Sequence, residues 1–179
     1  MHDLVTLVDS QDRVVGTAGK LEAHREALLH RACSVVLFNR RGEILLQQRS
    51  REKYHSGGLW SNTCCTHPRP DEEPLAAASR RLTEEMGLTC ALEPAFAFLY
   101  RAELDGGLVE HEYDHVFVGR ADADPRPDSR EVSAWRWQHP DAVRRDLDAR
   151  PETFTAWFAP LFRRLETSPT SGLVSPEAR

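Results

Sequence analysis

A thiol and an imidazole stand two residues apart in the segment Trp60-Ser-Asn-Thr-Cys-Cys65-Thr-His67-Pro68. A cysteine can transfer a proton, and a neutral histidine nitrogen can bind a metal ion. The segment therefore has the residue types for proton transfer beside a metal centre. The alternative is a strand end with buried thiols and a surface histidine, because a free cysteine is commonly a small buried hydrophobe. The neighbouring segments decide between the two.

Three acids alternate with other residues in the strand-like stretch 108–118, at Glu110, Glu112 and Asp114. Because the side chains of a strand point to alternate faces, these three share one face. Carboxylates gathered on one face of an interior strand are unfavourable unless a cation neutralises them. The stretch therefore predicts a cation near these acids.

A further acidic pair, Glu84 and Glu85, falls in the last turn of a helix expected from Pro74 to Met86. Asp71 is the expected N-cap of this helix, and Gly87 is its expected stop. Carboxylates in a last turn oppose the helix dipole, so a cation would compensate for them. Hard oxygen ligands suit Mg²⁺, and we expect that ion here.

Cations at Arg49, Arg51 and Lys53 follow the expected strand 43–48 at every second position. On an extended chain they would lie on the same side. One interpretation is a solvated edge, which is usual for a run of charges. The other is a phosphate clamp, which is favoured by the loop His55-Ser-Gly-Gly58 leading into the cysteine segment.

The elements that must position these residues follow from hydrophobic periodicity. Strands are expected at 3–8, 13–17, 31–38, 43–48, 88–104, 108–118 and 131–137, and helices at 20–29, 74–86, 141–148 and 152–165. His24 and His30 would lie about 240° apart on one continuous helix. They can share an ion only if His30 lies beyond the helix.

The composition predicts one cytoplasmic domain. The chain has 179 residues, long enough for a substantial core, and a net charge of -5, which argues against a nucleic-acid partner. It has no apolar stretch of membrane length and no secretory signal. Its four cysteines do not form a disulfide framework. The serine, proline and glycine content of 167–179 predicts a flexible C-terminal tail, so the domain is expected over 1–166.

With these segments located, the chain resembles the type 1 isopentenyl-diphosphate isomerases, relatives of the Nudix hydrolases. Four separated motifs carry the resemblance from about residue 5 to residue 165. They are Lys20-x3-His24-x5-His30, Arg49-x3-Lys53 with the run Gly58 to Pro68, Glu84-Glu85-Met-Gly87, and Tyr100 with Glu110-His-Glu112. The resemblance implies an α/β fold, a Nudix-type α/β/α sandwich with a central mixed β-sheet.

The implied activity, in isoprenoid biosynthesis, interconverts isopentenyl and dimethylallyl diphosphate by protonation and deprotonation through a tertiary carbocation. Cys65 would transfer a proton on one face of the substrate. Glu112, oriented by Tyr100, would transfer the other proton on the opposite face. Trp157, expected in the last helix, would stabilise the cation with its π face. Its alternative role is that of a core aromatic.

The resemblance also implies two metal sites. One is a Zn²⁺ or Mn²⁺ site, whose ligands would be His24, His30, His67, Glu110 and Glu112. The other is a Mg²⁺ at Glu85 that reaches the substrate diphosphate, which Lys20, Arg49 and Lys53 would bind. The expected partner is this small-molecule substrate, with no nucleic acid and no membrane, for a monomer or weak homodimer. The remaining cysteines, Cys33, Cys64 and Cys90, and the histidines His55, His111 and His115 are expected to be structural, while Asp114 departs from the family pattern.

Two alternatives stay open, a Nudix-type diphosphate hydrolase and a non-catalytic metal- or nucleotide-binding domain. The hydrolase signature is G-x5-E-x7-R-E-U-x-E-E-x-G-U, where U is bulky and apolar. Here Thr66 replaces the first glycine, and Arg81 replaces the glutamate that follows the arginine. A cation in place of a metal-binding carboxylate reverses the local charge and disfavours the hydrolase.

Overall fold

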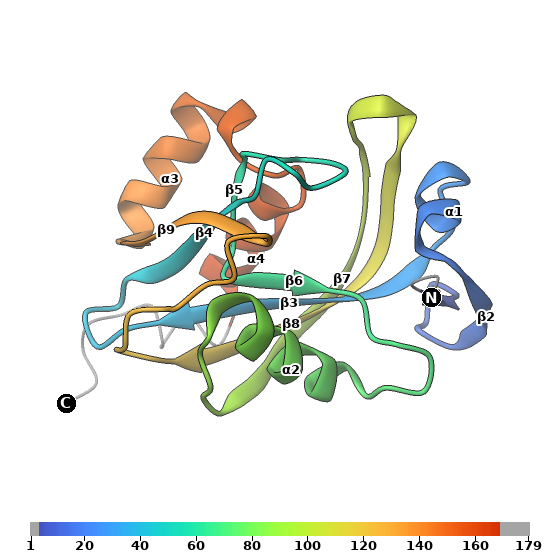
Figure 1. Cartoon of the computed structure of the whole chain (residues 1–179), viewed down its shortest axis with the longest axis horizontal. Helices are drawn as coiled ribbons and strands as arrows, with labels where there is room; N and C mark the ends of the chain where they lie inside the picture. Colours follow the sequence, from blue (N-terminus) through green and yellow to red (C-terminus); the bar gives the residue numbers. More distant parts are fainter. Residues whose placement is uncertain (1–3, 169–179) are drawn as a thin grey trace.

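The computed structural model describes residues 4–168. It shows a mixed β-sheet with helices on both faces (Figure 1). Within those residues nine strands join one sheet, in which the path β2-β1-β3-β4-β5 is extended by β6, β7, β8 and β9. The strands are β1 (Leu4–Val8), β2 (Val14–Gly19), β3 (His30–Phe38), β4 (Ile44–Arg49), β5 (Trp60–Ser61), β6 (Cys64–Thr66), β7 (Leu92–Glu103), β8 (Val109–Arg120) and β9 (Val132–Gln138). The helices are α1 (Lys20–Arg25), α2 (Pro74–Met86), α3 (Pro140–Ala149) and α4 (Phe158–Thr167), with short 3-10 turns at Asp105–Gly107 and Pro151–Thr153.

Strand β3 lies at the centre of the sheet and sets the register of the site. Strand β8 pairs with it in parallel, which puts His30 opposite Glu112. Strand β6 pairs with its other edge in the antiparallel sense, which puts Ser34 opposite Cys65. The strand with the predicted metal-binding acids and the strand with the predicted thiol therefore flank β3 on opposite edges.

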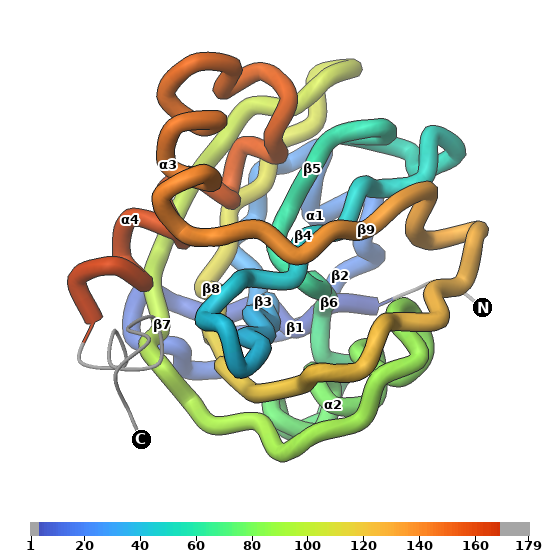
Figure 2. Tube along the Cα trace, turned by 90° about the vertical axis from the view of Figure 1, so that its left-hand side faces the viewer, coloured from blue at the N-terminus to red at the C-terminus, as the bar shows by residue number. Residues whose placement is uncertain are grey.

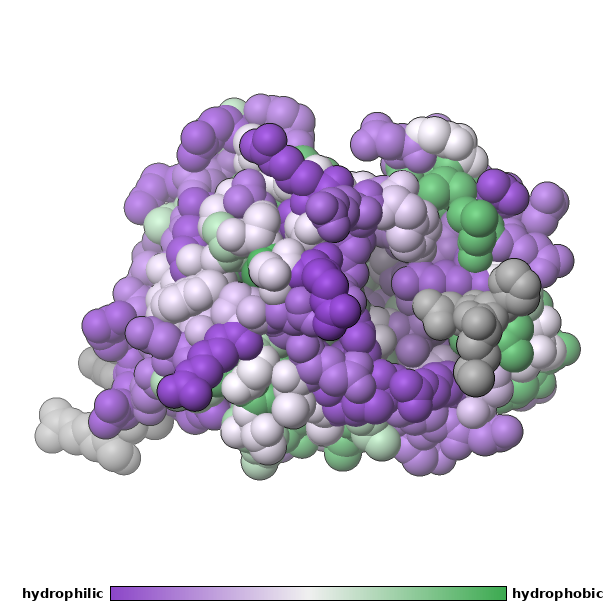
Figure 3. All heavy atoms as spheres, viewed as in Figure 1, coloured by the Kyte–Doolittle hydropathy of each residue, from purple (hydrophilic) through white to green (hydrophobic). Residues whose placement is uncertain are grey.

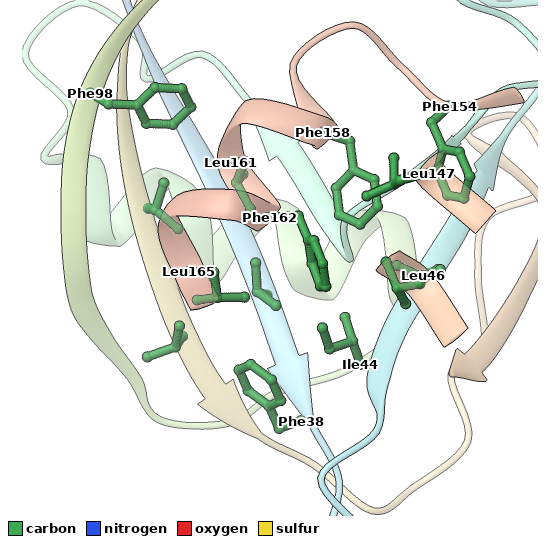
Figure 4. Packing of buried hydrophobic residues seen from close by; sticks show 14 residues of the cluster. Phe38, Ile44, Leu46, Phe98, Leu147, Phe154, Phe158, Leu161, Phe162 and Leu165 are labelled. Atoms are coloured by element: carbon green, nitrogen blue, oxygen red, sulfur yellow. The ribbon is translucent and has the colours of Figure 1, made fainter. Parts of the chain in front are cut away.

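Side chains of β3 alternate between two cores, as a strand buried on both faces requires. Val36 and Phe38 pack on the side of α3 and α4, and Val35 and Leu37 on the side of α2. Figure 2 shows α2 on one side of β3 and α3 and α4 on the opposite side. The residues that pack around α4 are labelled in Figure 4 and include Ile44, Leu46, Phe98, Phe158, Leu161, Phe162 and Leu165. This packing confirms the predicted sandwich of helices around a mixed sheet.

The helix expected at 20–29 is shorter than predicted. It ends at Arg25, and Ala27 takes a positive φ of 52° that turns the chain out of the helix. His30 is then the first residue of β3. His24 and His30 therefore lie on different elements, as sharing one ion requires.

The helix expected at 152–165 is wrong over its first half. A 3-10 turn occupies Pro151–Thr153, and Phe154 then forms a parallel bridge with Trp60. The backbone N–H of Thr155 donates to the carbonyl of Trp60 at 2.9 Å. Because this segment pairs with β5, α4 begins only at Phe158, and Trp157 is its N-cap residue.

Other differences are smaller. The N-cap of α2 is Glu73, not Asp71, which lies in a turn with φ 63°; Pro74 then starts the helix and Gly87 ends it with φ 64°, as predicted. Strand β7 starts at Leu92, four residues later than expected. The opening hairpin and the helix expected at 141–148 are confirmed as β1 with β2 and as α3.

The expected tail lies almost wholly outside the described residues. Thr167 ends α4 and Ser168 is buried, whereas positions 169–179 are not described. Among residues 4–168 no helix has the length and apolar character that crossing a membrane requires.

Candidate active site

A pocket of about 800 Å³ opens between α1, the loop 50–58, β6, β8 and α2. All side chains predicted for the site line it except Arg51, His24 and His30, and the two histidines are buried next to the lining residues His67, Glu110 and Glu112. Figure 3 shows the hollow between α1 and the loop 50–58, surrounded by hydrophilic residues. The fold therefore brings together residues that lie more than a hundred positions apart in the chain.

Five potential metal ligands gather at one end of this pocket, with one ligand atom of each within 4.8 Å of the others. They come from α1, from the start of β3, from the residue after β6 and from β8, and are His24, His30, His67, Glu110 and Glu112. All except the partly exposed His67 are buried. The arrangement is the set predicted for a single ion.

Hydrogen bonds to the backbone decide which nitrogens face this centre. His24 Nδ1 lies 2.5 Å from the carbonyl of Lys20, and His30 Nδ1 lies 2.8 Å from the carbonyl of Leu28. A carbonyl only accepts, so each Nδ1 carries a hydrogen, and in the neutral ring each Nε2 presents a lone pair. His24 Nε2 lies 2.9 Å from Glu110 Oε2, so two acceptor atoms then face each other.

The five side chains could therefore hold a metal cation, and their ligand types fit Zn²⁺ or Mn²⁺. His30 Nε2 lies 3.2 Å from His67 Nε2 and 3.6 Å from Glu112 Oε1, so further acceptors converge on the same point. Burial lowers the pKa of His67 well below its usual value, which leaves the neutral ring that binds a metal. Burial also acts to lower the pKa of His30, but Glu112, the carbonyl of Leu28 and the charge of Glu110 together outweigh it and raise that pKa.

The thiol of Cys65 faces the pocket from β6. Its Sγ donates to Asn62 Oδ1 at 3.1 Å and lies 3.6 Å from Ser34 Oγ. Burial, with the charge of Asp114, raises the pKa of Cys65 to about 12. The group is therefore a thiol near neutral pH. Its neighbour Cys64 is fully buried in the core beside α2, as predicted.

Glu112 faces the same pocket from β8 and accepts a hydrogen bond from the Tyr100 hydroxyl. Burial and the charge of Glu112 raise the pKa of Tyr100 well above its usual value, so the hydroxyl keeps its hydrogen and remains a donor. Trp157 also borders the pocket, and the Arg49 guanidinium lies 5.3 Å from its ring centroid. The site thus combines a thiol, a carboxylate, an aromatic wall and five potential metal ligands.

The Nudix domain family model matches residues 28–158 of the chain. An isopentenyl-diphosphate Delta-isomerase from Pectobacterium atrosepticum is 53% identical over 161 residues, which cover 90% of each chain. The protein of the same name from Burkholderia multivorans is 49% identical, over 92% of this chain and 93% of its own. This chain belongs to the isopentenyl-diphosphate Delta-isomerase family.

Solved structures show the same fold at lower identity. A Deinococcus radiodurans protein superimposes with a TM-score of 0.74 at 20% identity, over 90% of this chain and 98% of its own. A MutT protein from Methanosarcina mazei gives a TM-score of 0.63 at 23% identity, over 78% and 94%. The sandwich is therefore a Nudix fold, in agreement with the prediction.

In this family member the cations predicted to bind the diphosphate line the pocket, but not on an extended chain. Strand β4 ends at Arg49, and the loop 50–58 then turns. Lys20, Arg49 and Lys53 line the pocket, whereas Arg51 is exposed and does not. The prediction that Arg49, Arg51 and Lys53 share one side of an extended chain was wrong. The loop turns back, and Gly58 N donates to Arg49 O at 3.0 Å.

The helix-dipole argument for Mg²⁺ at Glu85 also needs correction. The acids in the last turn of α2 already have cationic partners, because Arg81 reaches Glu85 Oε1 at 2.6 Å and Glu84 at 2.8 Å. No extra cation is needed to balance the helix dipole. Glu85 nevertheless lines the pocket and is 4% exposed, so it remains the candidate Mg²⁺ ligand on position alone.

Two charged or ionisable pocket residues that the sequence did not assign to the site, Glu131 and His55, contact residues that it did assign. Glu131, at the residue before β9, forms ion pairs with Lys53 through Oε2 and with Arg81 through Oε1. His55, expected to be structural only, lines the pocket with Nε2 3.4 Å from Glu110 Oε1. Glu131 stands in no local pattern, and the loop that begins at His55 indicated a phosphate clamp but no role for His55 itself.

The third acid of β8 also has a partner. Asp114 is buried and accepts a hydrogen bond from Ser34 Oγ at 2.8 Å. The shared face predicted for Glu110, Glu112 and Asp114 is confirmed by the burial of all three. Asp114 is not one of the five potential metal ligands. Its hydrogen-bond partner Ser34 also lies 3.6 Å from Cys65 Sγ.

Proposed function

We propose that this chain interconverts isopentenyl diphosphate and dimethylallyl diphosphate. One observation carries the proposal. Cys65 and Glu112 come from strands on opposite edges of β3 and line the same pocket. A shift of a double bond by one position needs a proton delivered at one carbon and removed at another, so it needs two such groups around one substrate.

Cys65 exchanges a proton on one face of the substrate, and Glu112 exchanges the other. One proton is added to the terminal methylene carbon of isopentenyl diphosphate, and one is removed from the methylene next to the carbinol carbon. The net charge of the substrate is unchanged. Tyr100 supports Glu112 by donating its hydroxyl hydrogen to the carboxylate. The high pKa of the Cys65 thiol suits a group that starts protonated.

The intermediate is a tertiary carbocation, which water would capture if it reached it. Trp157 is 4% exposed and presents an aromatic surface at the pocket, which supports its role as the cation-stabilising wall. A Zn²⁺ or Mn²⁺ ion held by His24, His30, His67, Glu110 and Glu112 would fix the position of Glu112 and tune its proton affinity.

The diphosphate binds the cations Lys20, Arg49 and Lys53. Arg49 Nε is buried without a hydrogen-bond partner among the described residues, which supports an anionic ligand beside it. Glu85 would hold the Mg²⁺ that accompanies the diphosphate, after release from Arg81.

A direct assay tests the proposal. Purified protein, loaded with Zn²⁺ or Mn²⁺, is incubated with isopentenyl diphosphate and Mg²⁺, and dimethylallyl diphosphate and free phosphate are both measured. We expect the isomer without phosphate release. Phosphate release alone would overturn the proposal in favour of a hydrolase centred on α2, and binding without either product would favour a non-catalytic domain.

A further inference from the structure

The side chain of Asn62 has every hydrogen-bonding group engaged and is 0% exposed. Its Nδ2 donates to the carbonyl of Val35 at 3.1 Å and to that of Cys64 at 2.9 Å. Both amide hydrogens therefore go to backbone oxygens, so the amide cannot be flipped without losing both bonds. Its Oδ1 is left to accept the thiol hydrogen of Cys65 at 3.1 Å.

A chain of buried hydroxyls continues from Asn62 to the segment that carries Trp157. Ser61 Oγ donates to Asn62 Oδ1 at 3.0 Å. Since the single hydrogen of Ser61 is used there, the contact of 2.9 Å between Ser61 Oγ and Thr155 Oγ1 requires Thr155 to donate. Ser61 and Thr155 are each 1% exposed, so water does not compete for these bonds.

The backbone ties the same segments together. Thr155 N donates to Trp60 O at 2.9 Å, and Phe154 bridges to Trp60. Thr155 is two residues before Trp157, which borders the pocket. The thiol on one wall of the pocket and the indole on another are therefore held by one continuous set of buried hydrogen bonds.

We propose that Asn62 is a positioning residue for Cys65, and that the chain Asn62–Ser61–Thr155 sets the thiol and Trp157 in one fixed geometry. The inference rests on the proposed function, because it matters only if Cys65 transfers a proton. A thiol can rotate about its Cα–Cβ bond, and only some rotamers point the sulfur at a substrate carbon. Asn62 selects one rotamer, since its own orientation is determined by two backbone carbonyls.

The first test replaces Asn62 by Ala. Loss of the acceptor frees the thiol, and we expect kcat to fall by about 10- to 100-fold with little change in KM, as for a misplaced reacting group. The S–H stretching band of Cys65, obtained as an infrared difference against Cys65→Ala, should move to higher wavenumber because the hydrogen bond is gone. An unchanged kcat or an unmoved band would overturn the positioning role.

The second test uses milder variants, because Asn62→Ala also leaves two carbonyls unpaired and lowers stability. Thr155→Val keeps the shape of the side chain and removes one hydroxyl. We expect it to lower kcat about threefold or more in the wild-type background and to have no further effect in a Ser61→Ala background, where its acceptor is missing. Additive effects would show that Thr155 does not act through Ser61.

Thr63→Val is the matched control. Thr63 is also 0% exposed, and its hydroxyl bonds to Leu45 O at 2.7 Å and Leu37 N at 2.9 Å, away from Cys65. We expect a lower Tm with kcat within about twofold of wild type and no band shift. If the control lowers kcat as much as Asn62→Ala, general destabilisation explains both and the inference fails. A wild-type protein without isomerase activity would instead refute the proposed function.

Discussion

The guanidinium of Arg81 lies 2.6 Å from the carboxylate of Glu85 at the end of α2. This pair stands where the Nudix hydrolase signature has two carboxylates, one of them at position 81. The negative charge of Glu85 is therefore neutralised by Arg81 until another cation competes for the carboxylate. An isomerase needs less from this helix than a hydrolase, because no water has to be activated.

Glu85→Gln tests the Mg²⁺ role that follows from this position. The variant removes the charge that would bind Mg²⁺, and we expect the Mg²⁺ concentration for half-maximal activity to rise by about tenfold or more. Titration of isomerase activity with Mg²⁺ measures this. Glu84→Gln, one residue earlier and paired with the same arginine, serves as the control and should leave the midpoint almost unchanged.

Burial lowers the pKa of Lys53 to about 8, with Arg49 and Lys20 also acting to lower it. Below that pH the side chain is charged and attracts the diphosphate, whereas above it the charge is lost. We therefore expect kcat/KM to fall as the pH rises through about 8, mainly through KM. Lys53→Arg keeps its charge at this pH and should move the fall well to higher pH. An identical pH profile for both proteins would exclude Lys53 as the group responsible.

Glu131 provides an independent check on that group. It is ion-paired with Lys53, so its carboxylate favours the charged lysine. Glu131→Gln should shift the fall in kcat/KM to lower pH, opposite to the shift from Lys53→Arg. No shift would mean that the ion pair is absent in solution.

Cys65→Ala removes the thiol proposed for proton transfer. We expect kcat to drop by about 10²- to 10⁴-fold, the range typical of a lost acid or base. Cys64→Ala is the matched control, since this thiol is buried in the core beside α2 and does not line the pocket. It should lower the Tm but keep most of the activity. Wild-type turnover in Cys65→Ala would rule out the role.

Metal binding should stabilise the fold, because the five ligands come from separate elements. We expect the Tm of chelator-treated protein to rise on addition of Zn²⁺ or Mn²⁺, through binding to the folded state only. His67→Gln should reduce this rise strongly. His139→Gln, a half-exposed histidine at the start of α3, should not change it. Equal Tm shifts in both variants would argue against the ligand cluster.

Local patterns in the sequence predicted the parts of the site that depend on local geometry. The period of two along 108–118 was enough to put Glu110, Glu112 and Asp114 on one face, since strand geometry alternates whatever the strand pairs with. The angle between His24 and His30 on a helix required a break between them if both are to bind one ion. The turn at Ala27 supplies it.

Long-range pairing decided the rest. Residues 152–157 have a helical pattern, but Phe154 and Thr155 bond to β5, nearly a hundred residues earlier in the chain, and this sets the position of Trp157. Glu131 and His55 belong to the pocket only because β9 and the loop 50–58 fold against it. Hydrogen bonds and ion pairs between distant segments leave no periodic signal in sequence, so they required the tertiary structure.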